Sequence, residues 1–387
     1  MKYLILLGDG MADWPIDELD GLTPLEYAKT PNMDRVAGGI KGLVRTVPKG
    51  FPPGSDVANM SVMGYDPRKY YTGRAPIEAV SKSIELGERD VAYRCNFVTI
   101  ENGVMKDFSA GHIPSDRAKR LVELLNEQLD FKGIEFHAGV SYRNLMVWRN
   151  GKTDRTTPPH DITDKPIEQF LPQGEAADTL KEIMNRAGEI LTKNKIHPPA
   201  NAIWLWGEGK KPAMDSFESR FSKKACMISA VDLMVGLGKL TGMYIPTIDG
   251  LTGFIDTNYE GKVKAAIDFL ADGGDFVYLH VEATDEAGHM GDLQTKIKAI
   301  ELFDEKVVGE VLRGLDSLGD GARVAVLPDH PTPIRIKTHT DEPVPFAVYD
   351  TRYVASAGIY SERSCAEGVF IENGADFIVE ALFEKVQ

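Results

Sequence analysis

The strongest constraint on the fold of this chain is a run of apolar residues that occurs three times and is followed each time by acidic or imidazole side chains. The runs are KYLILLG at 2–8, DFVYLHVEA at 275–283 and ARVAVLPD at 322–329. Short continuous apolar runs are typical of strands buried on both faces of a parallel sheet. Between the last two runs, residues 291–319 carry apolar side chains at helical spacing. This strand–helix–strand order predicts an α/β core in which helices flank a mostly parallel sheet.

The middle of the chain has a different pattern. A further apolar helix is expected at 226–240, but residues from about 85 to 215 show short alternating runs, turn-rich pieces and one polar helix at 176–194. The chain has 387 residues, which is more than one ordinary domain. We therefore predict that 1–84 and 216–387 form the core and that 85–215 is an inserted, smaller α+β domain.

Composition bears on partners and compartment. Hydrophobic residues make up 43% of the chain and charged residues 26%, which is typical of a soluble globular protein. The formal net charge of -14 argues against nucleic acid or an anionic membrane as the main partner. The cysteines lie far apart without CxxC spacing, which suits a reducing cytosol. The apolar start of the chain breaks at Gly8, too early for a signal peptide or a membrane span. A cytoplasmic location is expected.

Possible metal ligands follow each of the three predicted strands. They are Asp9 after the first strand, Asp285 and His289 after the second, Asp329 and His330 after the third, and His339 a few residues later. Ligands bind outside the carboxyl ends of the strands in open α/β sheets, so we expect these side chains to meet at one edge. Mixed carboxylate and imidazole ligands suit Mn²⁺ or Zn²⁺, and their number predicts two ions. A single Asp after a strand is usually a helix cap, so the prediction depends on the whole set.

The segment FPPGSDVANMS at 51–61 supplies a nucleophile for such a site. Two prolines and Gly54 predict a turn, and the helix expected after them has Ser55 or Asp56 at its N-cap. Capping is the usual role of a serine in this position. A neighbouring metal ion can instead deprotonate the hydroxyl, while the helix N-terminus directs N–H groups at an anion. The two roles predict the same local geometry, and the residues alone leave both open.

Taken together, the motifs LLGDGMAD, PGSDVAN, YYTGRAP, DEAGHMGD, PDHPTP and HTDEPVPF resemble the cofactor-independent phosphoglycerate mutases, in their shorter archaeal-type branch. That family belongs to the alkaline phosphatase superfamily, so the resemblance implies an alkaline-phosphatase-like core. It covers both core segments and, more loosely, the insert through YRCNFVT, GVSYRNLMV and PPHDI. The implied activity is the interconversion of 3-phosphoglycerate and 2-phosphoglycerate through a phosphoserine intermediate at two divalent ions. Mn²⁺ is the expected metal, with Zn²⁺, Mg²⁺ and Co²⁺ as alternatives.

The resemblance also implies roles for individual residues. One ion would be held by Asp285, His289 and His339, and the other by Asp9, Ser55, Asp329 and His330. Ser55 would accept the phosphoryl group, and the 2-hydroxyl of the retained glycerate would take it back. The substrate, a small phosphorylated carboxylate, would be contacted by Asn59 in the core and by Arg94, Arg143, His160 and Asp161 in the insert, which would act as a lid. Arg94 and Arg143 are equally compatible with surface ion pairs.

Three other functions fit the same core motifs. They are a homoserine kinase-type phosphotransferase, a metal-dependent phosphomonoesterase and a non-catalytic metal-binding module. The chain has neither a GxxxxGK[ST] P-loop nor a kinase-type glycine-rich loop, which favours the mutase. The remaining histidines His137, His197 and His280 lack such a context and are assigned to structure. The sequence leaves the oligomeric state open.

Overall fold

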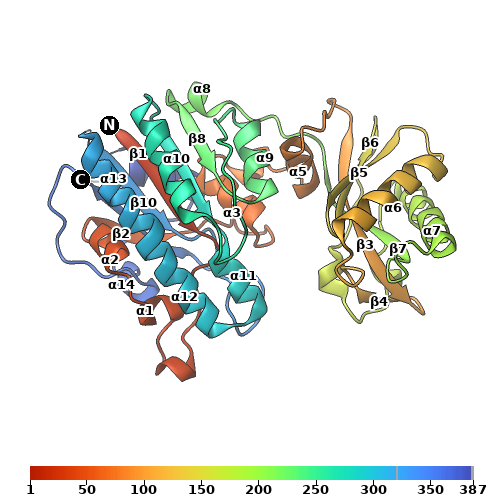
Figure 1. Ribbon diagram of the computed structural model, residues 1–387, viewed down its shortest axis with the longest axis horizontal. Coiled ribbons are helices and arrows are strands. Elements are labelled where there is room, and N and C mark those ends of the chain that lie inside the picture. The colour runs from red at the N-terminus through yellow and green to blue at the C-terminus, as the bar shows by residue number, and fades with distance from the viewer. Residues whose placement is uncertain (320, 385–387) are drawn as a thin grey trace. The chain divides into compact units, whose positions relative to one another are not determined.

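The computed structural model describes residues 1–319 and 321–384, which Figure 1 shows as a ribbon. These residues divide into two compact units. The first comprises Met1–Tyr71 and the chain from Met214 onward, and the second comprises Thr72–Ala213. The second unit therefore begins at Thr72 instead of the expected 85, because α5 (Arg74–Ser81) packs against strands of that unit.

The first unit is built on a seven-stranded sheet with the order β12-β2-β11-β10-β1-β9-β8. Its strands are β1 (Lys2–Gly8), β2 (Ile40–Val44), β8 (Ala225–Ile228), β9 (Phe276–Val281), β10 (Ala322–Leu327), β11 (Val344–Asp350) and β12 (Val369–Ile371). The strands β8, β9, β1 and β10 are parallel, β12 is parallel to β2, and β11 is antiparallel to both of its neighbours. The predicted α/β class with a mostly parallel sheet is confirmed, and the three predicted strands lie side by side at its centre.

Helices connect the strands of this sheet. They are α1 (Pro24–Tyr27), α2 (Pro31–Ala37), α3 (Ser55–Val62), α4 (Pro67–Tyr70), α8 (Phe217–Phe221), α9 (Asp232–Leu240), α10 (Tyr259–Ala271), α11 (Ala283–Met290), α12 (Leu293–Phe303), α13 (Glu310–Leu318) and α14 (Glu362–Cys365). The helix predicted at 291–319 corresponds to α12 and α13, which a π-helical segment at Asp304–Gly309 joins. A second π-helical segment covers Ile378–Phe383, and short 3-10 turns cover Asp17–Leu19 and Gly374–Asp376.

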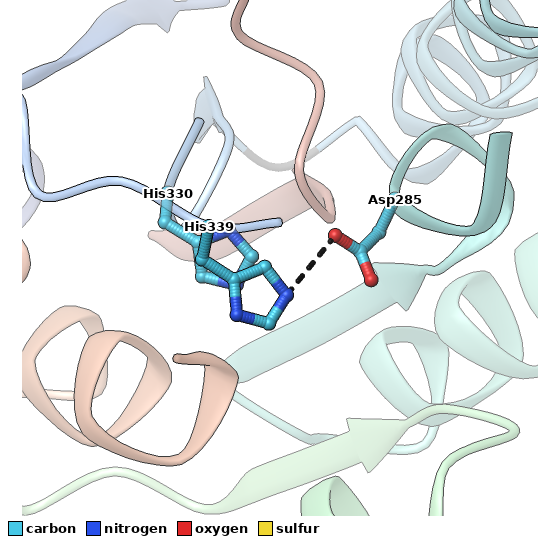
Figure 2. A group of neighbouring side chains, drawn as sticks. All are labelled: Asp285, His330 and His339. Carbon is cyan, nitrogen blue, oxygen red and sulfur yellow. Dashed lines mark ion pairs between the residues drawn. The ribbon is translucent and has the colours of Figure 1, made fainter. Parts of the chain in front are cut away.

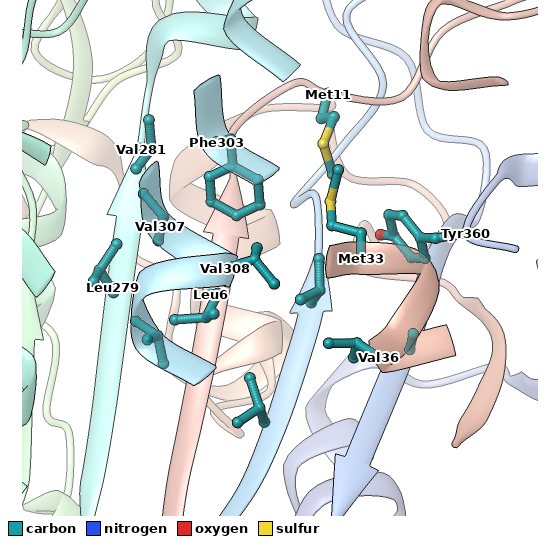
Figure 3. Close-up of a cluster of buried hydrophobic side chains, with 14 of the residues drawn as sticks. Leu6, Met11, Met33, Val36, Leu279, Val281, Phe303, Val307, Val308 and Tyr360 are labelled. Carbon is teal, nitrogen blue, oxygen red and sulfur yellow. The ribbon is translucent and has the colours of Figure 1, made fainter. Parts of the chain in front are cut away.

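The main hydrophobic core lies between one face of the sheet and the helices α2, α10, α12 and α13. Figure 3 shows Leu6 of β1 and Leu279 of β9 beside Phe303, Val307 and Val308 of the long helical segment. These five side chains are fully buried, and each such burial stabilises the fold by roughly 1.5–3 kcal/mol. The parallel strands β1 and β9 are thereby held in a fixed register below the edge at which the site forms.

The prediction of a helix at 226–240 is wrong for its first residues. Ala225–Ile228 is the edge strand β8, parallel to β9, and α9 begins only at Asp232. A four-residue apolar run is too short for its periodicity to distinguish a strand from a helix. Pairing with β9, which is distant in the sequence, decides the conformation.

The second unit contains an antiparallel sheet of five strands with the order β4-β3-β6-β5, and β7 also pairs with β3. The strands are β3 (Val91–Glu101), β4 (Val104–Asp107), β5 (Ile134–Val140), β6 (Arg143–Trp148) and β7 (Ala202–Gly209). The helices of this unit are α5, α6 (Ser115–Gln128) and α7 (Ala177–Asn194), with 3-10 turns at Pro159–Ile162 and Glu168–Phe170. Among the helices of the described residues, none has the length and apolar character that a membrane crossing requires.

Candidate metal centre

The predicted ligands come together at the carboxyl edge of the central strands. Asp9 follows β1, Asp285 lies in the first turn of α11 just after β9, and Asp329 and His330 follow β10. The order β10-β1-β9 and the parallel register bring these strand ends into one row. His339 lies in the segment between β10 and β11. Figure 2 shows Asp285, His330 and His339 directed at one another from α11 and the loops beyond β10.

The first group consists of Asp285, His289 and His339. His289 Nε2 lies 3.2 Å from Asp285 Oδ2 and 3.0 Å from His339 Nε2, and His339 Nε2 lies 3.5 Å from Asp285 Oδ1. Asp285 and His289 reach the same point because residues four apart share a face of α11. Two atoms bound to one ion at about 2.1 Å stand roughly 3.0–3.4 Å apart, so these spacings fit a shared cation.

The orientation of His289 also fits a cation. Its Nδ1 lies 3.0 Å from the carbonyl oxygen of Lys337, which can only accept a hydrogen bond. Nδ1 therefore carries a proton, which leaves Nε2, the nitrogen that faces Asp285 and His339, as the atom that would bind a cation. Burial disfavours the negative charge of Asp285, yet hydrogen bonds from His289 and His339 hold the pKa of Asp285 well below its usual value. Asp285 in turn raises the pKa of His289 to about 9 despite burial. A proton thus occupies the place that a cation would take.

The second group surrounds Ser55. The Ser55 Oγ atom lies 3.1 Å from His330 Nε2, and this nitrogen lies 3.4 Å from Asp329 Oδ2 and 3.7 Å from Asp9 Oδ1. Burial lowers the pKa of His330 to about 4, so its ring is neutral and keeps a lone pair. Asp329 is fixed because its Oδ1 accepts hydrogen bonds from the backbone N–H groups of Gly10 and His330. His330 also lies within reach of Asp285 and His339, so it stands between the two groups.

Asp9 gives the clearest sign that a cation belongs in this group. Its Oδ1 atom is buried and has no hydrogen-bond partner among the described residues. Burial raises the pKa of Asp9 well above its usual value, and the nearby Asp329 and Asp285 raise it further. A buried carboxylate oxygen without a donor costs free energy unless a cation neutralises it. The residues present therefore fit a divalent ion held by oxygen and imidazole ligands.

Ser55 is not the N-cap of α3, and neither is Asp56. The cap position is Gly54, whose backbone is extended, and Ser55 is the first helical residue. Because Ser55 follows the cap position, its hydroxyl does not cap the helix. The hydroxyl faces His330 instead. Asp56 uses its Oδ1 atom to accept from the N–H of Val57. The half-buried hydroxyl of Ser55 is therefore directed into the group of ligands rather than to its own helix.

Two buried residues have partners that sequence reasoning did not find. His280, assigned to structure, lies with Nε2 3.0 Å from Asp9 Oδ2 and forms a compact group with Asp9 and Asp329. Asn59, expected to contact the substrate, is fully buried and donates to Asp329 Oδ2 and to the carbonyl oxygen of Ser55. A polar side chain inside the apolar run DFVYLHVEA was the signal for His280, but its target depends on strand order.

The substrate residues predicted in the insert lie in the second unit, where two of them meet at Trp206. Arg94 is 6% exposed, stacks over the Trp206 ring at 4.3 Å and places Nε 3.0 Å from Glu78 Oε2. The His160 ring lies 5.3 Å from the Trp206 ring. Arg143 is exposed at the start of β6. The Asp161 side chain is exposed too, with Oδ1 3.8 Å from His160 Nε2.

Arg74 and Glu78 belong to the same cluster and were not predicted. The Arg74 Nε atom lies 2.8 Å from Glu78 Oε1, so Glu78 bridges Arg74 and Arg94. Burial alone would raise the pKa of Glu78, but Arg94, Arg74 and Arg143 hold it below its usual value. The four-residue spacing of Arg74 and Glu78 in a helix was the available signal. Arg94 is thus primarily an ion-pair partner in this conformation, and Arg143 has the more exposed guanidinium.

Comparison with known proteins shows the family. Residues 37–197 match the profile of the 2,3-bisphosphoglycerate-independent phosphoglycerate mutases. The mutase of that name from Methanothrix thermoacetophila is 51% identical over 378 residues, which cover 95% of this chain and 96% of the relative. A solved protein from Pyrococcus horikoshii has a TM-score of 0.80 at 30% identity, covering 98% of this chain and 95% of the other. The cofactor-independent phosphoglycerate mutase of Thermoplasma acidophilum has a TM-score of 0.64 at 26% identity, with 98% of both chains covered.

Proposed function

The chain belongs to the family of 2,3-bisphosphoglycerate-independent phosphoglycerate mutases, and on that premise we propose that its isomerase reaction passes through a phosphoryl group carried on Ser55. Its activity is the interconversion of 3-phosphoglycerate and 2-phosphoglycerate. The observation that supports Ser55 is the position of its hydroxyl, 3.1 Å from His330 Nε2 in a group that also contains Asp9 and Asp329. A cytoplasmic location is part of the proposal, because the substrates are highly charged metabolites.

The reaction divides into two exchanges at the Ser55 hydroxyl. In the first, Ser55 Oγ forms a bond to phosphorus, the bond from phosphorus to O3 of 3-phosphoglycerate breaks, and the proton lost by Ser55 is balanced by one gained at O3. The free glycerate then turns within the site. In the second exchange its O2 takes the phosphoryl group, O2 loses a proton and Ser55 regains one. A covalent intermediate of this kind replaces one difficult transfer with two easier ones.

The proposed ligand sets are those implied by the family resemblance. Asp285, His289 and His339 would hold one divalent ion, and Asp9, Ser55, Asp329 and His330 would hold the other. The orphaned Oδ1 of Asp9 and the facing Nε2 atoms of His289 and His339 support this division. Bound ions would lower the pKa of the Ser55 hydroxyl and neutralise phosphoryl oxygens. Mn²⁺ is our choice, because carboxylate, hydroxyl and imidazole ligands together suit it.

Substrate recognition is assigned to the second unit. Arg143, His160 and Asp161 have exposed side chains and are proposed to contact the carboxylate and hydroxyl groups of the substrate. Arg94 is proposed to support this surface through Glu78 and Trp206. Asn59 is reassigned from substrate contact to support of Asp329, because its amide hydrogens are engaged inside the core.

The test is to trap the phosphoryl group. Brief exposure of the Mn²⁺-loaded protein to ³²P-labelled 3-phosphoglycerate and an acid quench should label a peptide that contains Ser55. Ser55→Ala should abolish the label and reduce turnover by several orders of magnitude. Ser61→Ala is the matched control, because Ser61 lies on the same helix and its hydroxyl donates to the carbonyl oxygen of Val57. Its turnover should equal that of the wild type.

Three results would overturn the assignment. Normal turnover of Ser55→Ala excludes the covalent intermediate at this residue. A label that appears only with ATP, with homoserine as the acceptor, replaces the mutase by a kinase. Hydrolysis of p-nitrophenyl phosphate without mutase turnover would instead show a phosphomonoesterase. The three substrates are therefore assayed in parallel on one protein preparation.

A further inference from the structure

The strand β9 presents two polar side chains to the face of the sheet opposite the main core. Val277, Leu279 and Val281 alternate with Tyr278 and His280 along the strand, and the first three belong to the main core cluster. Figure 3 shows Leu279 and Val281 in that cluster. Alternation directs Tyr278 and His280 to the other face, where both are buried. Buried polar groups of this size need partners, and the partners identify a role.

His280 holds one oxygen of Asp9. Its Nε2 lies 3.0 Å from Asp9 Oδ2, and its Nδ1 lies 3.2 Å from the hydroxyl of Ser229, just beyond β8. With a cation at its other oxygen Asp9 would be ionised and could only accept, so in that state Nε2 donates its proton to Asp9. In the neutral ring Nδ1 then accepts, and the Ser229 hydroxyl is its donor. The N–H of Val231 donates to Ser229 Oγ at 3.0 Å, which fixes the hydroxyl in this direction.

Tyr278 supports the carboxylate of Asp329 through the side chain of Asn59. Its hydroxyl donates to Asn59 Oδ1 at 2.7 Å. The Asn59 amide nitrogen donates to Asp329 Oδ2 at 2.8 Å and to the carbonyl oxygen of Ser55 at 2.9 Å. With the amide oxygen occupied by Tyr278, Asn59 has one orientation that satisfies all three bonds. The relay therefore fixes Asp329 and the first turn of α3 together.

The geometry distinguishes a supporting role for His280 from direct coordination. Asp9, His280 and Asp329 lie close enough to share an ion, so direct coordination is a real alternative. His280 approaches Asp9 Oδ2, however, whereas His330 faces the other oxygen, Oδ1, which has no hydrogen-bond donor among the described residues. One oxygen of Asp9 is thus held from β9, and the other faces His330, the residue that Ser55 contacts. Such partners orient metal ligands in many proteins.

We infer that Tyr278 and His280 are positioning residues: from one face of β9 they hold Asp329 and Asp9 so that the ion proposed beside Ser55 is bound tightly. The inference rests on the proposed function, because it assumes the second ligand group. It adds residues that touch neither the substrate nor the ion. It also explains why a strand that packs into the core on one face carries a phenol and an imidazole on the other.

The test measures the affinity for Mn²⁺ by competition with a chelating dye, without substrate. His280→Ala and Tyr278→Phe should each weaken the affinity of one of two ions by about 10- to 100-fold. His280→Gln places an amide N–H where Nε2–H stood, and it should keep the affinity within about threefold of the wild type. Matched controls are His137→Gln, beside Glu135 in the second unit, and Tyr93→Phe, whose hydroxyl bonds to the carbonyl oxygen of Lys152. Both should bind like the wild type.

Kinetics and stoichiometry separate the outcomes. A positioning role predicts that saturating Mn²⁺ restores most of the kcat of Tyr278→Phe while KM for 3-phosphoglycerate stays unchanged.

If His280→Gln and His280→Ala both bind a single ion at any concentration, His280 is a ligand and the inference is overturned. Unchanged affinity in His280→Ala and Tyr278→Phe overturns it too. A wild type that binds no divalent ion would refute the proposed function itself. Thermal melting without metal identifies a variant that fails to fold. If His280→Ala fails to fold, the Mn²⁺ affinity of Tyr278→Phe, which loses only one oxygen atom, tests the inference.

Discussion

Single hydrogen bonds decide what two residues at the start of α3 do. Ser55 follows the cap position, so its hydroxyl is directed to His330 and not to a backbone amide. Asn59, one turn later, lies inward and joins Ser55 to Asp329. A serine and an asparagine that look like surface helix residues in the sequence are therefore parts of one buried network. Substitutions here should change the site more than the stability of the helix.

Asp285→Asn tests the first ligand group with almost no change in side-chain size. The amide lacks the negative charge that is proposed to hold a cation between His289 and His339, so turnover should fall by at least about 10²-fold. Elemental analysis of Mn²⁺-loaded protein should find fewer ions per chain than in the wild type. Melting of the metal-free protein should show that the variant is folded.

Asp292→Asn is the control for that substitution. Asp292 caps α12 by accepting from the N–H of Thr295, and an asparagine caps nearly as well. Its metal content and turnover should match those of the wild type. Full activity and unchanged metal content in Asp285→Asn would remove Asp285 from the ligand set.

At the level of elements, the turn after β1 is the tightest part of the site. Gly10 has a φ of +59°, which favours glycine. A Cβ atom there would lie 2.4 Å from Asp285 Oδ1 and from Thr332 Oγ1, and 2.9 Å from the Cα atom of Asp285. Thr332 donates to the same carboxylate oxygen, so the turn, α11 and the loop after β10 are packed against one another. The close approach of three elements requires a residue without a side chain.

Gly10→Ala should therefore lower both the stability and the affinity for Mn²⁺. The left-handed conformation alone costs roughly 1–2 kcal/mol for a residue with a Cβ, and the contact with Asp285 adds to it. Gly21→Ala is a matched comparison, because Gly21 has a φ of +77° with no described atom within 4 Å of the added Cβ. Urea unfolding should show the larger loss for Gly10→Ala, and dye competition should show weaker Mn²⁺ binding only there. Equal losses of stability in the two variants would mean that a small shift relieves the contact between the added Cβ and Asp285.

The helix α14 contributes a dependence of stability on pH. Burial, with a smaller contribution from Glu26, raises the pKa of Glu362 from its usual value of 4.5 to about 7, although the Thr23 hydroxyl and the Asp13 N–H donate to it. Between about pH 4.5 and 7 the folded protein keeps a proton that the unfolded chain has released. The free energy of unfolding should therefore fall as pH rises through this range and level off above it. The positive charge of buried Lys296 interacts with Glu362 and favours its ionised form, which opposes the rise of the Glu362 pKa.

Glu362→Gln should remove this dependence while it keeps an acceptor for the Asp13 amide. Urea unfolding at pH 5, 6, 7 and 8 should show that the variant gains stability relative to the wild type as pH rises. The exposed Glu367→Gln, close by in the chain, should run parallel to the wild type. If the free energies of unfolding of Glu362→Gln and the wild type differ by the same amount at every pH in this range, a group other than Glu362 causes the pH dependence.

At the scale of the whole molecule, the chain crosses between its two units twice, at Tyr71–Thr72 and at Ala213–Met214. The second crossing is preceded by Lys210 and Lys211, which are exposed and lie in a segment without regular structure. Two crossings of this kind permit the second unit to act as a lid that closes over substrate and excludes water from phosphoserine. This role remains a prediction.

Trypsin should cut the protein at the Lys210–Lys211 bond, since the next bond precedes Pro212 and is resistant. Mn²⁺ together with 3-phosphoglycerate should slow the cut, because closure restricts the crossing segment. Lys210→Gln should prevent it and confirm the site. Resistance at this bond without any ligand, or a rate that substrate and Mn²⁺ leave unchanged, would contradict a hinge at this crossing.

Much of the site was predictable because its parts are local in the sequence. An apolar run followed by Asp9, by Asp285 and His289, or by Asp329 and His330 specifies both a buried strand and the ligands at its end. Parallel strands place their carboxyl ends at one edge, so the meeting of these ligands follows from the pattern. The covering helices follow from apolar periodicity, and even the interruption at Asp304–Gly309 leaves the predicted helix in place.

The rest depends on contacts between residues far apart in the chain. His280 and Asn59 have ordinary surroundings in the sequence, and their roles arise because the order β10-β1-β9 brings Asp9 beside His280 and α3 beside Asp329. The strand β8 forms because β9 is available to pair with it, and Thr72 opens the second unit because α5 packs there. Local pattern thus determined which residues meet at the carboxyl edge of the sheet, whereas tertiary packing decided which side chains hold them there, because hydrogen bonds between distant segments exist only once the sheet has formed.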